Sequence, residues 1–144
     1  MVSQVLTKLV ILLSVATTSD SSVNCTLENN VCALRNETTL RFFVLGDFGG
    51  NDAAPFTSQI QLAVAKQLDK HCDSKNPHFF FEAGDNFYEN GVNESTSPRF
   101  NATFESVYHY GKDRNVPWYI AAGNHDHRSR AEAQIEYSKL NPRW

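Results

Sequence analysis

The hydrophobic pattern of the chain alternates between short, continuously apolar segments and longer segments with helical spacing. The apolar segments contain few polar residues and cover residues 42–45, 79–81 and 118–122. Continuous apolar runs of this length are typical of strands in a sheet that is covered on both faces. The pattern therefore predicts three buried strands.

The segments that follow these strands have the spacing of helices. Ser58 and Gln61 form a potential capping box, and apolar residues then recur at helical intervals as far as Cys72, which predicts a crossover helix from Ser58 to Cys72. A second helix is expected over residues 98–109, and residues 130–139 are a third candidate. The expected inward residues of the second helix are Phe100, Phe104, Val107 and Tyr108. This alternation predicts an α/β fold with right-handed βαβ units and parallel strands.

The amino terminus has the features of a secretory signal peptide. Lys8 precedes an apolar run over residues 9–16 that ends in small residues, so we expect a signal peptide over residues 1–18. The run is far shorter than the roughly 20 residues needed to span a bilayer. Residues 19–40 are rich in Ser, Asn and Thr and are expected to form a mobile polar leader that packs little. The folded domain is expected over residues 41–144.

Composition and charge narrow the class of protein. A net charge of −3 and 41% hydrophobic residues describe an ordinary globular domain. No cluster of Lys and Arg indicates a nucleic-acid partner, and no segment indicates a membrane partner. Four sequons fit export and predict possible N-glycans at Asn24, Asn36, Asn93 and Asn101. The predicted location is therefore outside the cell or in the lysosome, reached through the secretory pathway.

The chain has three cysteines, so at least one has no partner within it. Cys25 and Cys32 are close enough in sequence to close a small loop in an oxidising compartment. Cys72 is then unpaired. Either its partner lies outside these residues, or it is a buried free thiol, which is a common state of unpaired cysteine.

Each predicted strand ends in a glycine that is followed by an oxygen-bearing side chain: Asp47, Asp85 or Asn124. A glycine allows a sharp turn at the strand exit, and ligands of open α/β sheets gather at the carboxyl edge of the strands. Carboxylate and amide oxygens suit metal ions, and one carboxylate can bridge two of them. Tyr88 adds a phenol, which becomes a ligand when a strong Lewis acid such as ferric iron removes its proton.

The three segments 46–50 (GDFGG), 84–88 (GDNFY) and 123–127 (GNHDH) resemble conserved blocks of the purple acid phosphatases, within the calcineurin-like metallophosphoesterases. The nearest resemblance is to the animal tartrate-resistant acid phosphatases, and it extends over residues 41–144. It implies a two-sheet α/β sandwich with flanking helices, of which this chain supplies the N-terminal half only. Phe48 stands where tryptophan is usual in this family, and we expect it to keep an aromatic wall at the site.

The resemblance also implies a role for each candidate residue. Asp47 and Tyr88 would bind Fe(III), Asp85 would bridge both metals, and Asn124 would bind a divalent metal, Fe(II), Zn or Mn. His125 would contact the substrate phosphate or assist the leaving group. The implied reaction is hydrolysis of phosphate monoesters, including phosphoproteins, at acid pH.

Family members are roughly twice as long as this chain, and three further histidine ligands lie beyond the matching region. We therefore expect the chain to be truncated before these ligands, and we expect metal binding and activity to be weak without them. One alternative is a secreted, non-catalytic glycoprotein or binding module that retains the scaffold. A phosphoesterase acting on diesters or nucleotides is a further alternative, which Tyr88 disfavours.

Other polar residues of the motifs have less defined roles. Asp126 is a candidate for orienting a neighbouring imidazole, and His127 has no direct metal role assigned. Three further histidines show no ligand spacing and are expected to be structural or exposed: His71, His78 and His109. Taken singly, Asp47 and Asn124 could be simple turn residues, but their repeated place after a strand and a glycine favours ligand roles.

Overall fold

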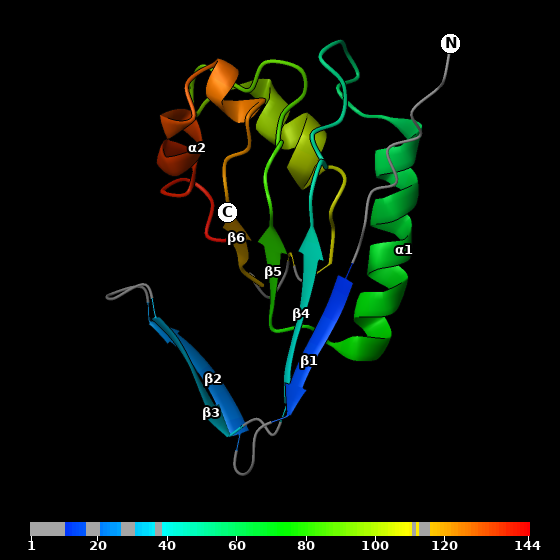
Figure 1. The fold of residues 1–144 in the computed structure, drawn as a ribbon, viewed down its shortest axis with the longest axis vertical. Helices are drawn as coiled ribbons and strands as arrows, with labels where there is room; N and C mark the ends of the chain where they lie inside the picture. Colours follow the sequence, from blue (N-terminus) through cyan, green and yellow to red (C-terminus); the bar gives the residue numbers. More distant parts are fainter. Residues whose placement is uncertain (1–10, 17–20, 27–30, 37–38, 111, 113–115) are drawn as a thin grey trace.

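The structure is a computed structural model that describes residues 11–16, 21–26, 31–36, 39–110, 112 and 116–144. A four-stranded sheet of order β1-β4-β5-β6 forms its centre, and β2 and β3 form a separate two-stranded sheet (Figure 1). The strands are β1 (Ile11–Ala16), β2 (Ser21–Thr26), β3 (Val31–Asn36), β4 (Thr39–Leu45), β5 (Phe79–Glu82) and β6 (Trp118–Ile120). The helical elements are α1 (Gln59–Lys75), the π-helical segment η1 (Phe100–Glu105), the 3-10 turn η2 (Asp126–Arg128) and α2 (Glu132–Tyr137).

The three predicted strands are confirmed as β4, β5 and β6. They lie side by side and run parallel, with Phe43 opposite Phe80 and Phe80 opposite Trp118. Strand β6 ends at Ile120, two residues before the predicted end, because the chain there already turns into the third loop. Parallel order brings the carboxyl ends of all three strands to one edge of the sheet.

The N-terminal region contains more strands than the sequence predicted. Strand β1 pairs antiparallel with β4, and it falls within the segment expected to be a signal peptide, residues 1–18. The expected leader, residues 19–40, contains the β2–β3 hairpin, in which Cys25 lies opposite Cys32. That register fits the small loop that their spacing allows. The signal peptide, the leader and the domain boundary at residue 41 stay predictions, although β4 already begins at Thr39.

Helix α1 begins as predicted and runs slightly further. Ser58 caps it by accepting a hydrogen bond from the Gln61 backbone N–H at 3.0 Å. The Gln61 side chain does not return to the cap but donates to the Thr103 carbonyl at 2.9 Å, so only half of the capping box forms. The helix ends at Lys75, where Asn76 adopts a left-handed conformation with φ 47°.

The second predicted helix is confirmed only in part. Its regular portion is the π-helical segment η1, in which the Ser106 N–H bonds to the Asn101 carbonyl five residues earlier. All four residues expected to face inward are buried. The third candidate is confirmed as the short helix α2. No helix in the described part of the chain is both long enough and apolar enough to cross a membrane.

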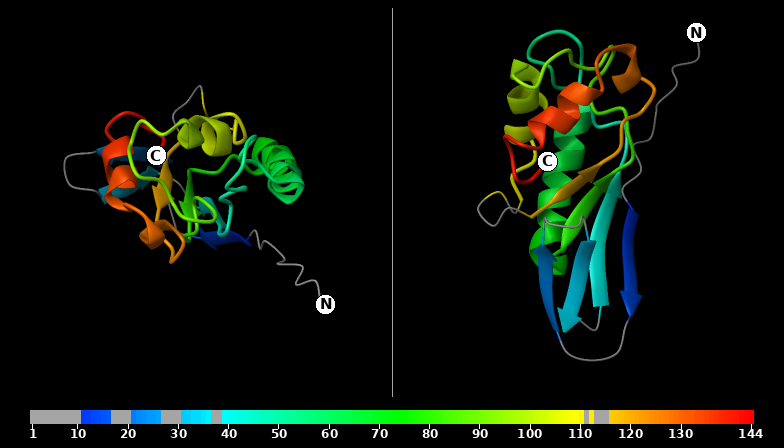
Figure 2. Two further views of the ribbon diagram at one scale, coloured as in Figure 1. Left: turned by 90° about the horizontal axis from the view of Figure 1, so that it is seen from above. Right: turned by 90° about the vertical axis from the view of Figure 1, so that its left-hand side faces the viewer.

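The hydrophobic core lies between one face of the sheet and the helical elements (Figure 2). Phe80 stacks on Trp118 with ring centroids 4.3 Å apart, and Phe104 meets Trp118 edge to face at 5.1 Å. Because side chains alternate along a strand, the neighbouring aromatic residues lie on the other face, where Phe81 and Tyr119 are 40% and 38% exposed. The prediction of a sheet covered on both faces is therefore wrong for the described residues, because only one face of these strands is buried.

Cys72 is completely buried in the core as a free thiol. Burial raises the pKa of this thiol, and the charges of Asp69 and Asp73 raise it further. Because the thiolate is the reactive form, we expect Cys72 to resist iodoacetamide in the native chain at mildly alkaline pH and to react fully after unfolding in guanidinium. Mass spectrometry of the peptide that contains Cys72 measures both states. Rapid labelling of the native chain would contradict this placement.

Candidate metal centre

The loops that follow β4, β5 and β6 meet at the carboxyl edge of the sheet. The Asp47 N–H donates to the Gly84 carbonyl at 3.0 Å, and the Tyr88 N–H donates to the Gly49 carbonyl at 3.2 Å, which joins the first loop to the second. The His125 N–H donates to Asp85 Oδ1 at 3.0 Å, which joins the third loop to the second. The predicted convergence of the three motifs is thus present in the fold.

Two glycines, Gly123 and Gly49, allow neighbouring loops to approach each other closely. A Cβ at Gly123 would lie 2.2 Å from Asp85 Oδ1, and one at Gly49 would lie 2.7 Å from the Tyr88 nitrogen. Neither glycine has a left-handed φ. Instead, Asp47 and Asp85 themselves adopt positive φ values of 57° and 60°. Such strained positions in non-glycine residues gather at functional sites, so the fold pays about 1 kcal/mol or more to aim each carboxylate.

Asp47, Asp85 and Tyr88 bring three oxygen atoms together. The Tyr88 hydroxyl donates to Asp47 Oδ1 at 2.5 Å and lies 3.1 Å from Asp85 Oδ2. Burial raises the pKa of Tyr88, and the hydrogen bond and negative charge of Asp47, followed by those of Asp85, raise it further. The neutral phenol therefore places its O–H group between two negatively charged carboxylates. A cation with a strong preference for oxygen fits the same place, because it would be bound by both carboxylates and would displace that proton.

Asn124 lies on the third loop beside this group. Its side chain is exposed, and its two neighbours in sequence, Gly123 and His125, both approach Asp85. The backbone on either side of Asn124 therefore lies next to Asp85. This placement is consistent with a bridging Asp85 and a second cation near Asn124, and both ligand roles stay predictions.

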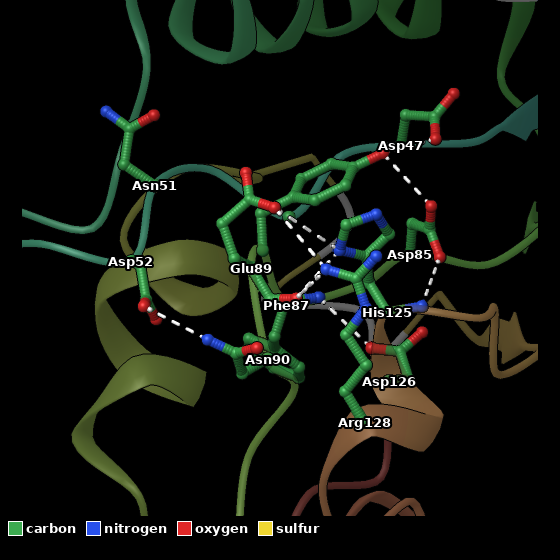
Figure 3. A network of polar contacts seen from close by, with 12 residues as sticks. Asp47, Asn51, Asp52, Asp85, Phe87, Glu89, Asn90, His125, Asp126 and Arg128 are labelled. Atoms are coloured by element: carbon green, nitrogen blue, oxygen red, sulfur yellow. Dashed lines mark hydrogen bonds and ion pairs between the residues drawn. The ribbon is translucent and has the colours of Figure 1, made fainter.

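The imidazole of His125 is oriented by the second loop (Figure 3). It packs edge to face on the Tyr88 ring at 4.6 Å, and Nδ1 lies 2.7 Å from the Glu89 carbonyl oxygen. A carbonyl only accepts, so Nδ1 carries a proton and Nε2 is the atom available to a substrate. Arg128 Nη1 donates to the same carbonyl at 3.2 Å, and its guanidinium and the imidazole both lie beside the Glu89 carboxylate.

Two expectations for motif residues are wrong. Phe48 does not form a wall of the site, because its ring is 1% exposed and packs on Tyr108 and Trp118 in the core. Asp126 does not orient an imidazole in this structure, because its carboxylate accepts backbone N–H groups instead, those of Asn86, Phe87 and Gly123. Phe48 and Asp126 are therefore buried residues that support the loops from inside the domain.

The remaining histidines are structural or exposed, as predicted. His78 bonds to Arg41 through both ring nitrogens, at 3.2 and 3.1 Å, and His71 and His109 are exposed. His127 is also exposed. Among the described residues, no three His, Cys, Asp or Glu side chains gather to hold a metal ion. The candidate centre consists of two carboxylates, a phenol and an amide, so its chemistry depends on oxygen donors.

Arg99 supports the first loop, a role that no motif in the sequence predicts. Its side chain is nearly buried and donates through Nη2 to the carbonyls of Gly49 and Asn51 at 3.0 and 2.9 Å. Nη1 also lies 3.5 Å from the Asp52 carboxylate. Gln134, on α2, is a second buried polar residue that sequence reasoning missed, and it contacts both Asn86 and Asp126. Both residues lie outside the motifs, so only tertiary structure reveals them.

Comparisons with known proteins agree with this geometry. The family model for calcineurin-like phosphoesterases matches residues 40–144. Tartrate-resistant acid phosphatase type 5 from Oryctolagus cuniculus is 47% identical over 106 residues, which cover 74% of this chain and 33% of the rabbit protein. The Homo sapiens protein of the same name is 44% identical over 73% of this chain and 32% of its own length. Purple acid phosphatase 17 from Arabidopsis thaliana is 31% identical over 93% of this chain and 38% of its own length.

A solved structure with the same fold is that of GAP50, described as the anchor in the inner membrane complex of Plasmodium. It superposes with a TM-score of 0.58 at 26% identity, over 67% of this chain and 29% of the GAP50 chain. This chain spans about one third of the length of the animal relatives it matches. The matched region nevertheless contains all three loops of the candidate centre. The chain belongs to the calcineurin-like phosphoesterase family, and its similar relatives within that family are acid phosphatases.

Proposed function

We propose that this chain contributes the aspartate, tyrosine and asparagine ligands of a dinuclear metal centre in an acid phosphatase that hydrolyses phosphate monoesters. The observation that carries the proposal is the Tyr88 hydroxyl, which lies 2.5 Å from Asp47 and 3.1 Å from Asp85. A phenol has an ordinary pKa near 10 and becomes a metal ligand when a strong Lewis acid removes its proton. This favours Fe(III) at the Asp47 side, with Fe(II), Zn or Mn at the Asn124 side.

Each residue then has a task that its contacts support. Asp47 and Tyr88 would hold the ferric ion, Asp85 would be shared by both ions, and Asn124 would hold the divalent ion. When bound, the two metal ions would supply Lewis-acid stabilisation of the phosphate and of the attacking oxygen. In its doubly protonated form, His125 would donate the proton on Nε2 to the departing alkoxide and become neutral, while Nδ1–H stays bonded to the Glu89 carbonyl and fixes the ring.

The proposal assigns further histidine ligands to a part of the protein outside these residues. Asp47, Asp85 and Tyr88 would be three of four ligands for Fe(III), and Asp85 with Asn124 would be two of four for the other ion. Neutral imidazole is a principal ligand for transition metals, so both sites are expected to be weak without it. We therefore expect the chain alone to bind little iron and to show negligible phosphatase activity.

Export through the secretory pathway is part of the proposal. It rests on the predicted signal peptide, residues 1–18, and on the sequons. Asn93 and Asn101 lie in the segment that follows the second loop, and both are exposed. A glycan could therefore be attached at either residue. The natural substrate would be a phosphate monoester, such as a phosphoprotein. The non-catalytic alternative has less support, because the similar proteins are named as phosphatases and the three loops keep their oxygen donors.

The experiment that tests this function is a chimaera. Residues 40–144 replace the matching segment of the rabbit acid phosphatase, whose remaining two thirds would supply the missing ligands. We expect the chimaera to bind two metal ions and to hydrolyse a chromogenic phosphate monoester at acid pH, while the 144-residue chain alone does not. A folded chimaera without metal or turnover would overturn the proposed function.

Tyr88→Phe in this chimaera tests the ferric ligand. A phenolate bound to Fe(III) absorbs visible light, so we expect the wild-type chimaera to be coloured and the variant to be bleached, with the fold retained. Visible absorption and iron content measure the effect. Tyr110→Phe is the control, since the Tyr110 hydroxyl bonds to Asn76 far from the loops at 3.0 Å. Colour that survives Tyr88→Phe would exclude Tyr88 as the ligand.

A further inference from the structure

Asp126 is a buried carboxylate with an unusual set of partners. Its side chain is 0% exposed. It accepts hydrogen bonds from the backbone N–H groups of Asn86 at 3.0 Å, Phe87 at 3.1 Å and Gly123 at 2.8 Å. Within the described residues it forms no ion pair, so its partners are these backbone N–H groups and the Gln134 amide.

The partners of Asp126 belong to the two loops that carry the candidate ligands. Asn86 and Phe87 directly follow Asp85, while Gly123 directly precedes Asn124. One carboxylate therefore holds the backbone next to Asp85 and the backbone next to Asn124 at the same time. Figure 3 shows Asp126 beside Phe87, below Asp85 and His125. This arrangement fixes the distance between the second and third loops.

A neutral side chain completes the arrangement. Gln134 on α2 donates from Nε2 to Asp126 Oδ1 at 2.9 Å and accepts from Asn86 Nδ2 at 2.8 Å. Asn86 Nδ2 also donates to the Ala121 carbonyl, at the end of β6, at 2.8 Å. Asp126, Asn86 and Gln134 are all buried. Helix α2 is thereby connected to the underside of both loops.

We propose that Asp126 is a positioning residue that sets the separation between Asp85 and Asn124, and with it the spacing of the two cations that these ligands would hold. The claim about the spacing of the cations rests on the proposed function. The claim that Asp126 holds the two loops together rests on its contacts alone. An asparagine in its place would keep one acceptor oxygen and would turn an NH2 group toward donors, so it would leave backbone N–H groups unpaired.

Amide hydrogen exchange in the 144-residue chain tests the structural part. For Asp126→Asn we expect exchange at Asn86, Phe87 and Gly123 to accelerate by about tenfold or more, as for the loss of charge-assisted hydrogen bonds. The Ala83 amide, which donates to the Leu45 carbonyl between β5 and β4 at 2.8 Å, should keep its rate and so report on the intact sheet. Unchanged exchange at all three loop amides would overturn the inference.

Two further variants keep the test decisive. Glu136→Gln is the matched control, because Glu136 lies on α2 and pairs with Arg130 at the surface, away from Asp126. Gln134→Leu removes only the neutral partner and should accelerate exchange mainly at Asn86, while Gly123 stays protected by the carboxylate. If Asp126→Asn does not fold, faster exchange at Asn86 with continued protection of Gly123 in Gln134→Leu supports the inference. Equally faster exchange in both loops of Gln134→Leu would overturn it.

Mn²⁺ affinity tests the functional part. In the rabbit chimaera, we expect Asp126→Asn to weaken Mn²⁺ binding about ten- to a hundredfold relative to the unsubstituted chimaera, as for residues that orient metal ligands, and Glu136→Gln to leave it unchanged. Loosened loops with unchanged Mn²⁺ affinity would overturn the positioning role. If the unsubstituted chimaera bound no Mn²⁺, the proposed function would fail, and the exchange rates alone would decide whether Asp126 fixes the two loops.

Discussion

Asp85→Asn in the rabbit chimaera is expected to lower phosphatase turnover by at least about a thousandfold, because metal ions stabilise the transition state by several kcal/mol. Asp85 is the candidate shared by both ions, and it also accepts from the Tyr88 hydroxyl and the His125 N–H at 3.1 and 3.0 Å. Steady-state turnover of a chromogenic monoester and metal analysis measure the loss together.

The control for this variant is Asp73→Asn, on the exposed surface of α1. It makes the same chemical change far from the loops, and we expect full metal content and turnover. Retention of more than about a tenth of the turnover by Asp85→Asn would contradict a shared ligand, since a loss below tenfold corresponds to less than 1.4 kcal/mol.

Gly123→Ala is expected to damage both the fold and the site. The added Cβ would lie 2.2 Å from Asp85 Oδ1 and 2.3 Å from the Asp85 nitrogen, so the second and third loops would have to separate. Forced overpacking of this kind lowers the free energy of unfolding by about 1–3 kcal/mol. Urea denaturation of the 144-residue chain measures the loss of stability, and Mn²⁺ titration measures the expected loss of binding.

Gly46→Ala provides the matched control for this steric argument. Gly46 also ends a strand and precedes a candidate ligand, but a Cβ there would meet only Ala83 Cβ at 3.7 Å, an ordinary contact. We expect its free energy of unfolding to stay within about 0.5 kcal/mol of the wild-type value. Equal stability of the Gly123 and Gly46 variants would show that the loops are less closely packed than in this structure.

The secondary structure could be predicted where local pattern and tertiary context agree. Apolar runs located β4, β5 and β6, and Ser58 marked the start of α1, because burial and capping follow directly from residue type. The sequence did not predict β1, since its apolar run also has the features of a signal peptide. It did not predict the β2–β3 hairpin either, because pairing between strands stabilises a segment whose composition is polar.

The sequence predicted which residues form the candidate site, but only part of the contacts that hold them in place. The motifs correctly brought Asp47, Asp85 and Tyr88 together. Gly84, before Asp85, has the positive φ of 113° that only a glycine adopts easily, as its place at a strand exit predicts. Gly123 does not, and it is needed instead because a Cβ there would meet Asp85, a contact between loops that the sequence does not reveal. The partners of Asp126 were missed for the same reason. A buried carboxylate can serve side chains or backbone, and only the fold distinguishes these uses.

We expect Asp47, Asp85, Tyr88 and Asn124 to be the ligands that this chain supplies to one dinuclear metal centre at the edge of the sheet. A titration of the isotope-labelled 144-residue chain with paramagnetic Mn²⁺, followed by NMR, tests it most directly, because broadening reports even weak binding and places it in the structure. We predict that the amide signals of these four residues broaden first, and that signals from α1 keep their width. Broadening centred elsewhere, or no localised broadening at all, would contradict the claim.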